Sequence, residues 1–255
     1  MGEPMCSSIP ILIFNKMNIE HLELIDDILE VNRRVCSALW DVSNVNSIPK
    51  GLSPRLIFPQ KRDEKIRISE QEARILYCGI LNNLNYFYSI ETPTTDTYQQ
   101  TGMEPVSASS DLSLYREKND HFDKVMNIEF KAHNPEPEDI RKDIEKLIRE
   151  RIAGNWFHVL KNTDSGTLPV LFEKMRDSLL ECKCFLEEVK LSFIFCFCVL
   201  EKSWACMKHF YYNPKEKNFQ KYLDAFFALD YSVRGGKIEV SQNNSWNIIK
   251  KDILR

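Results

Sequence analysis

The sequence predicts an α/β protein in which a mixed central β-sheet is flanked by helices. Two runs, 109–115 and 125–133, alternate apolar and polar residues with the period of a strand. Segment 70–84 instead carries apolar residues at helical spacing. Further along, strand-like 156–160 and the apolar run 191–200 are separated by a helical segment, and this βαβ succession favours parallel neighbouring strands.

Length and composition fit a globular protein. The 255 residues suffice for one large domain, or one domain with an appendage, and 43% apolar with 28% charged residues is ordinary. The net charge of −3 neither indicates nor excludes a nucleic-acid partner. Apolar runs fall far short of the roughly 20 residues of a membrane span, and 9–14 is too short for a secretory signal. We therefore expect a cytoplasmic protein with no membrane partner.

The N-terminal part is expected to pack on a central core. Residues 18–40 have helical spacing, with acidic residues early. Residues 41–65 contain several prolines and predict an irregular connection. We accordingly divide the chain into an N-terminal helix with its connection (1–65), a core (66–200) and a C-terminal helix and short strand (201–255).

The core begins with a capping box, Ser69-Glu70-Gln71-Glu72, that opens a helix to about residue 84. A strand is expected at 86–91. The polar segment 92–102, which ends in glycine, predicts a loop or wide hairpin that could contact nucleic acid.

The two alternating runs predict a hairpin connected through 116–124. In the second run Met126, Ile128, Phe130 and Ala132 share one face, opposite Asn127, Glu129, Lys131 and His133. If the two strands pair as a hairpin and bury their apolar faces together, Asp111, Glu129 and Lys131 converge on the opposite face of the hairpin. Two close carboxylates suit Mg²⁺, with Mn²⁺ as a substitute, and a nearby ammonium can orient an attacking water or stabilise the transition state of phosphodiester hydrolysis.

Asp111 and the tripeptide Glu129-Phe130-Lys131 resemble the catalytic motif of the PD-(D/E)XK superfamily, also called restriction-endonuclease-like nucleases. The two parts are 18 positions apart, a helix follows the second, and the resemblance covers about residues 66–200. Ser110 stands where the motif has proline. The resemblance implies a restriction-endonuclease-like core, metal ligation by Asp111 and Glu129, and catalysis by Lys131. It also implies a further acidic ligand from the preceding helix, where Glu72 fits the position, while Glu91 is an alternative.

After the second run, Pro135 and Pro137 predict the start of a helix whose inner face carries Ile140 and Ile144. Helices are expected from Thr167 toward 189 and over 216–229, and Gly235-Gly236 predicts a turn before a short strand.

Eight cysteines raise the question of a metal centre or disulfides. The two C-x-C pairs, Cys182/Cys184 and Cys196/Cys198, differ from the usual C-x₂₋₄-C spacing of zinc sites. Because the second pair lies in an apolar run, core packing is the favoured interpretation, with iron–sulfur or zinc binding as the alternative.

The function expected from these observations is Mg²⁺-dependent endonuclease activity, with DNA as the preferred substrate over RNA. Host defence, restriction and mobile-element processing are compatible settings, and a homodimer is compatible with the sequence. The alternative is a non-catalytic interaction or nucleic-acid-binding protein that retains the nuclease fold. Its Asp111, Glu129 and Lys131 would form a surface set of cross-strand ion pairs.

Overall fold

The computed structural model describes residues 19–43, 56–59, 66–98, 106–164, 166–185, 191–212, 218–241 and 243–251. Within these residues a seven-stranded sheet has the order β1-β2-β3-β4-β5-β6-β9. Its strands are β1 (Phe87–Tyr98), β2 (Val106–Lys118), β3 (His121–Ala132), β4 (Ala153–Leu160), β5 (Leu191–Val199), β6 (Trp204–Tyr212) and β9 (Asn247–Lys250). The helices are α1 (Ile19–Ser43), α2 (Glu70–Leu81), α3 (Pro137–Arg149), α4 (Leu168–Glu181) and α5 (Phe219–Phe227), with a 3-10 turn η2 at Cys182–Phe185. A separate hairpin joins β7 (Tyr231–Arg234) to β8 (Lys237–Val240).

The sheet is mixed, which confirms the predicted fold class. Strands β1, β2 and β3 pair antiparallel, whereas β3, β4 and β5 are parallel neighbours. Strands β6 and β9 extend the sheet antiparallel beyond β5. The parallel pairs are connected through α3 and α4, as the βαβ succession predicted.

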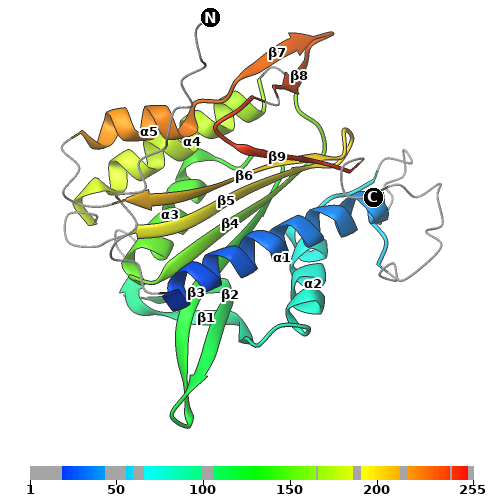
Figure 1. Ribbon diagram of the computed structural model, residues 1–255. Helices are drawn as coiled ribbons and strands as arrows, with labels where there is room; N and C mark the ends of the chain where they lie inside the picture. The colour runs from blue at the N-terminus through cyan, green and yellow to red at the C-terminus, as the bar shows by residue number, and fades with distance from the viewer. Residues whose placement is uncertain are drawn as a thin grey trace, which may run out of the picture.

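Helices cover both faces of the sheet (Figure 1). On one face α1 and α2 pack against the apolar side of the hairpin, and residues such as Val35, Tyr77 and Ile128 share one buried cluster. On the other face α3, α4 and α5 form a second, aromatic-rich cluster that includes Phe195 and Trp246. Burying apolar side chains on both faces is the main stabilising contribution in such a layered protein.

Several local predictions are confirmed. The expected helix 18–40 is α1, and Ser69 caps α2 with both hydrogen bonds of the capping box present. Strands β2 and β3 form the predicted hairpin, closed at Asn119 and Asp120, whose φ angles of 49° and 62° are both left-handed. A two-residue turn of this kind matches the twist of its strands, and in Figure 1 the hairpin projects beyond the helices.

Other predictions need correction. The segment 92–102, expected as a loop or wide hairpin, is not a loop as far as Tyr98: β1 continues to that residue and pairs antiparallel with β2 from Val106, which confirms the wide hairpin; residues 99–105 lie outside the described part. Strands β6 and β9 were not predicted, although both belong to the main sheet. The segments 1–65 and 201–255, which were expected to lie outside the core, thus belong to the main layers. The first contributes α1 to one face of the sheet, and the second contributes β6 and β9 to one end of it. Most of the expected connection 41–65, and the end of the helix expected to reach 189, lie outside the described residues. Among the described residues, no helix is long and apolar enough to cross a membrane.

Candidate active site

The hairpin brings Asp111 and Glu129 onto neighbouring strands at the same level. Leu112 pairs with Ile128, so one further step in the register sets Asp111 opposite Glu129. The backbone N–H of Phe130 donates a hydrogen bond of 2.7 Å to Asp111 Oδ2 and fixes that carboxylate. Lys131 follows two positions after Glu129 and contacts the same helix, α3. The structure therefore brings together three of the four predicted site residues.

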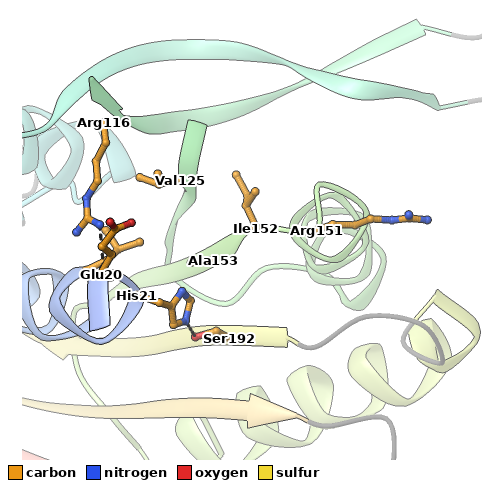
Figure 2. Close-up of a pocket in the computed structure, with 9 residues that line it drawn as sticks. Glu20, His21, Arg116, Val125, Arg151, Ile152, Ala153 and Ser192 are labelled. Carbon is orange, nitrogen blue, oxygen red and sulfur yellow. Dashed lines mark hydrogen bonds between the residues drawn. The ribbon is translucent and has the colours of Figure 1, made fainter. Parts of the chain in front are cut away.

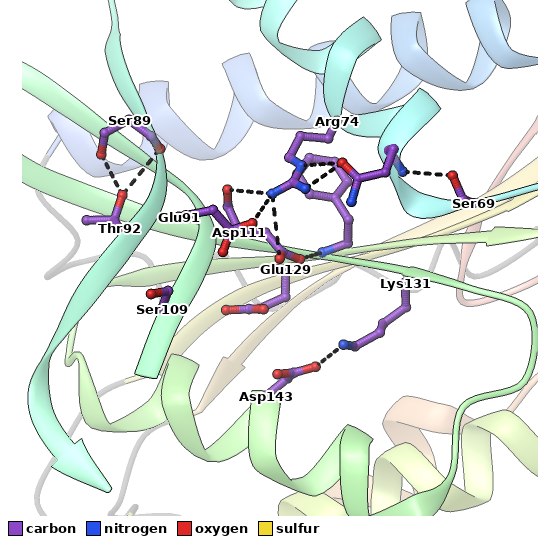
Figure 3. Close-up of polar contacts among 12 residues, drawn as sticks. Ser69, Arg74, Ser89, Glu91, Thr92, Ser109, Asp111, Glu129, Lys131 and Asp143 are labelled. Atoms are coloured by element: carbon purple, nitrogen blue, oxygen red, sulfur yellow. Dashed lines mark hydrogen bonds and ion pairs between the residues drawn. The ribbon is translucent and has the colours of Figure 1, made fainter. Parts of the chain in front are cut away.

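These residues belong to a larger set that we call the polar cluster (Figure 3). Helix α2 contributes an acid and an arginine, the strands contribute three acids and a lysine, and α3 contributes an acid and a lysine. The members are Glu70, Arg74, Glu91, Asp111, Glu129, Lys131, Asp143 and Lys146.

Glu129 is the most deeply buried member, at 1% exposure. Its Oε2 accepts a hydrogen bond of 3.0 Å from Lys146, whereas its Oε1 has no hydrogen-bond partner in the described part of the chain. Burial, followed by the charge of Asp143, raises the pKa of Glu129 well above its ordinary value, although Lys146 opposes this shift. A buried acceptor oxygen without a partner costs about 1–3 kcal/mol, so Glu129 Oε1 is a favourable place for a cation.

Lys131 points toward α3 and forms an ion pair of 2.5 Å with Asp143 Oδ2. Burial lowers the pKa of Lys131, but the ion pair with Asp143 outweighs it, and the net shift is upward. Lys131 is therefore an ammonium at neutral pH. Asp143 also binds Lys146 through Oδ1, at 2.8 Å, so it lies between the two lysines.

Asp111 lies next to an arginine from α2. Arg74 Nη1 is 4.0 Å from Asp111 Oδ1 and forms a closer ion pair with Glu91. Burial raises the pKa of Asp111, while the hydrogen bond from Phe130 opposes the rise. Glu91 has a left-handed φ of 52°, which in a non-glycine residue costs on the order of 1–3 kcal/mol and is most often found at functional sites.

Glu72, the fourth predicted site residue, is not brought to the cluster. Its carboxylate accepts hydrogen bonds from the backbone N–H and the hydroxyl of Ser69, as the capping box requires. The acid of α2 that belongs to the cluster is Glu70. Burial raises its pKa, and the neighbouring charges of Lys131 and Asp111 act on it.

A histidine fixes α2 relative to β3. His133, just beyond the end of β3, has a left-handed φ of 64°, and its Nε2–H donates to the carbonyl of Ile68 at 2.8 Å, directly before the cap of α2. The carbonyl of His133 in turn accepts from Nε2 of the buried His158, whose pKa burial lowers to about 4. The strand with Lys131 and the helix with Arg74 are thereby held together.

Within the described part of the chain, no three acidic, histidine or cysteine side chains form a ready metal-binding group. Asp111 and Glu129 remain as two adjacent carboxylates, one with a buried, unpartnered oxygen. Mg²⁺ typically takes one or two protein carboxylates and keeps several waters, so this donor set fits that ion better than one that needs an all-protein cage.

The C-x-C cysteines lie in different surroundings. Cys196 and Cys198 are fully buried in the cluster of α1 and α2, and Cys36 Sγ lies 3.7 Å from Cys196 Sγ. Burial raises the pKa of Cys198, which favours the neutral thiol. Cys182 is buried and Cys184 exposed in η2, not in the amphipathic helix where both were expected.

A second polar region surrounds a cavity of about 360 Å³ near the start of β5 (Figure 2). There Ser192 Oγ lies 2.9 Å from His21 Nε2 and 2.7 Å from His209 Nε2. Arg116 donates to the Glu20 carbonyl and to the Tyr86 hydroxyl. These polar groups bind one another, and we assign the cavity no function.

Comparisons with family models, with curated proteins and with solved structures gave no match. The functional assignment consequently rests on the polar cluster itself.

Proposed function

We propose that the protein is a Mg²⁺-dependent nuclease with a restriction-endonuclease-like core, and that DNA is its substrate. The observation that carries the proposal is the pair Asp111 and Glu129, side by side with a buried Glu129 oxygen that no described residue satisfies. Lys131 lies on the same face, in the relation that the superfamily motif implies. Buried acids with raised pKa values next to ammonium groups are typical of functional sites.

Asp111 and Glu129 would hold the metal ion. Glu70 is the acid of α2 near enough to influence both Asp111 and Lys131, and it takes the place that the sequence suggested for Glu72. When bound, Mg²⁺ supplies a water of lowered pKa and neutralises charge on a phosphoryl oxygen.

Lys131 acts through its charge rather than as a base. Its ammonium already carries a proton and is held by Asp143, so it cannot accept one from water. A water that has released a proton to solvent attacks phosphorus, the P–O bond to the leaving strand breaks, and the departing oxygen takes a proton from solvent. Negative charge grows on the phosphoryl oxygens during this step, and a fixed ammonium would stabilise it. Asp143 is a positioning residue, because it orients Lys131 and keeps it charged.

The test compares wild type, Lys131→Ala and Lys142→Ala on plasmid, linear duplex, single-stranded DNA and structured RNA. Lys142 is a matched control, since it lies on the exposed side of α3 and pairs only at 3.8 Å with Glu138. We expect Mg²⁺-dependent cleavage by wild type and Lys142→Ala, and a rate on the order of 10² to 10³ lower in Lys131→Ala. Gel-shift binding in Ca²⁺ should be similar for all three.

Undiminished cleavage by Lys131→Ala would mean that the catalytic residues have been misassigned. A second candidate function, binding without cleavage, is favoured by the internal pairing of Lys131 with Asp143 and of Lys146 with Glu129. Tight binding of one of the four substrates, with no cleavage under Mg²⁺ or Mn²⁺, would establish that function instead.

A further inference from the structure

Lys146 lies where a cation would be expected to bind. Its Nζ contacts three oxygens from three elements: Glu129 Oε2 of β3 at 3.0 Å, Asp143 Oδ1 of α3 at 2.8 Å and the Ser109 carbonyl of β2 at 3.0 Å. The side chain is only 12% exposed. Two carboxylates and a carbonyl are the oxygen ligands that hard cations take in proteins, and here an ammonium takes them.

Of the three carboxylates nearest Lys131 and Lys146 in the described part of the chain, only Asp111 and Glu129 keep an oxygen without a close donor. Both oxygens of Asp143 bind ammonium groups, one from Lys131 and one from Lys146. Asp111 Oδ2 is taken by the Phe130 N–H, whereas Asp111 Oδ1 and Glu129 Oε1 have no close hydrogen-bond donor among the described residues. These two oxygens, with Glu70 of α2 near Asp111, are available to a divalent ion, whereas the oxygens around Lys146 are already taken.

The charges of the polar cluster agree with a single ion. Its five acids face three cationic groups, Arg74, Lys131 and Lys146, which leaves an excess of two negative charges when all acids are ionised. One divalent ion neutralises that excess. A second one would add positive charge close to Lys146 and Lys131, at an energetic cost.

We propose that the site binds one divalent ion, not two, because the ammonium of Lys146 permanently takes the place of the second. The inference rests on the proposed function and specifies its metal requirement. In two-metal sites the ions lie about 3.5–4 Å apart and share carboxylates. Lys146 contacts Glu129 Oε2 and leaves Oε1 without a partner among the described residues, so Lys146 would act as a positioning residue for the carboxylate that holds the ion.

The experiment counts bound Mn²⁺ by electron paramagnetic resonance of the free ion during titration of metal-free protein. Wild type should bind one Mn²⁺ per chain, with no cooperativity. Lys146→Ala should bind a second, because Glu129, Asp143 and the Ser109 carbonyl become available to it. The control Lys142→Ala should bind one.

Two ions in wild type would overturn the inference but leave the proposed nuclease function intact. One ion in a folded Lys146→Ala would also overturn it, since the ammonium would then not be what excludes the second ion. No binding by wild type would overturn both the inference and the proposed function. Circular dichroism shows whether Lys146→Ala is folded; if it is not, the wild-type count decides alone.

Discussion

Replacing Lys146 with methionine is expected to destabilise the protein in a pH-dependent manner. The change removes the ammonium that contacts Glu129 Oε2 and leaves that carboxyl group, at 1% exposure, without its cation. Asp143 keeps Lys131 as a partner. The principal effect therefore falls on Glu129.

The magnitude follows from two routes open to the folded variant. If Glu129 stays ionised, removing one partner of a buried pair typically costs about 3–5 kcal/mol. If Glu129 instead takes up a proton, each unit by which its pKa then lies above its already raised value in wild type costs about 1.4 kcal/mol. The less costly route applies, so the loss is at most about 3–5 kcal/mol, which corresponds to a melting temperature lower by up to about 6–20 °C for a chain of this size.

The pH dependence has a definite sign. A carboxyl group whose pKa is raised in the folded state stabilises the fold below its unfolded value of 4.5, and that stabilisation is lost as pH rises through the folded pKa. Removing Lys146 raises the folded pKa of Glu129 further, so the variant loses more than wild type does. The difference in unfolding free energy should stay near zero until the pH reaches the raised folded pKa of Glu129 in wild type, and above it should grow by up to about 1.4 kcal/mol per pH unit.

Urea unfolding followed by circular dichroism at several pH values measures this difference. Lys142→Met, on the exposed side of the same helix, should stay within about 0.5 kcal/mol of wild type throughout. A Lys146→Met variant as stable as wild type at every pH, or a loss that does not change with pH, would refute the assignment of Lys146 as the counter-ion of Glu129.

Further predictions concern the binding of the metal ion and the packing around two glycines. Saturating Mg²⁺ or Mn²⁺, at about 100 times the dissociation constant, should add about 2.7 kcal/mol to wild-type stability. In thermal unfolding, the metal should stabilise Asp111→Ala less than wild type. The metal should also stabilise wild type less as pH falls, because protonated Glu129 must release its proton to bind the ion. Equal stabilisation of wild type and Asp111→Ala would contradict a metal site at these residues. Gly154→Ala should cost about 1–3 kcal/mol in urea unfolding, because the added Cβ would lie 2.5 Å from a ring carbon of Phe193. Gly79→Ala in α2, where the added Cβ meets nothing within 4 Å, should stabilise the protein by about 0.5–1 kcal/mol, and the opposite order would contradict the packing.

The elements that could be predicted from the sequence are those with one buried face, because burial of one face spaces the apolar residues periodically along the element. Strands β2 and β3 have one apolar face against α1 and α2, and alternation follows where that face is covered. Toward its turn at Asn119 and Asp120 the hairpin projects past the helices, so no apolar face is needed there and the predicted strands ended too early. Strand β9 is only four residues long, which is too short for any period to be recognised.

The same reasoning explains what was found and missed in the site. Asp111, Glu129 and Lys131 lie on regular strands, where position determines the face. Asp143 and Lys146 lie on α3 and contact Lys131 and Glu129 of β3. Helical spacing in the sequence does not reveal tertiary contacts of this kind. Helix caps can be predicted from sequence, and the cap of α2 is what engages Glu72.

The burial of the polar cluster favours a metal site over a structural set of surface ion pairs. A surface set of ion pairs would be exposed and would contribute at most about 1 kcal/mol per pair. The side chains of Asp143 and Lys146 are instead 10% and 12% exposed, and Glu129 has a buried oxygen without a partner in the described chain. Apolar residues in such positions are often as stabilising as a buried ion pair, or more so, so stability alone does not account for this arrangement. A bound cation accounts for the excess of acids and for the unpartnered Glu129 oxygen, and we therefore favour a metal site over a purely structural role.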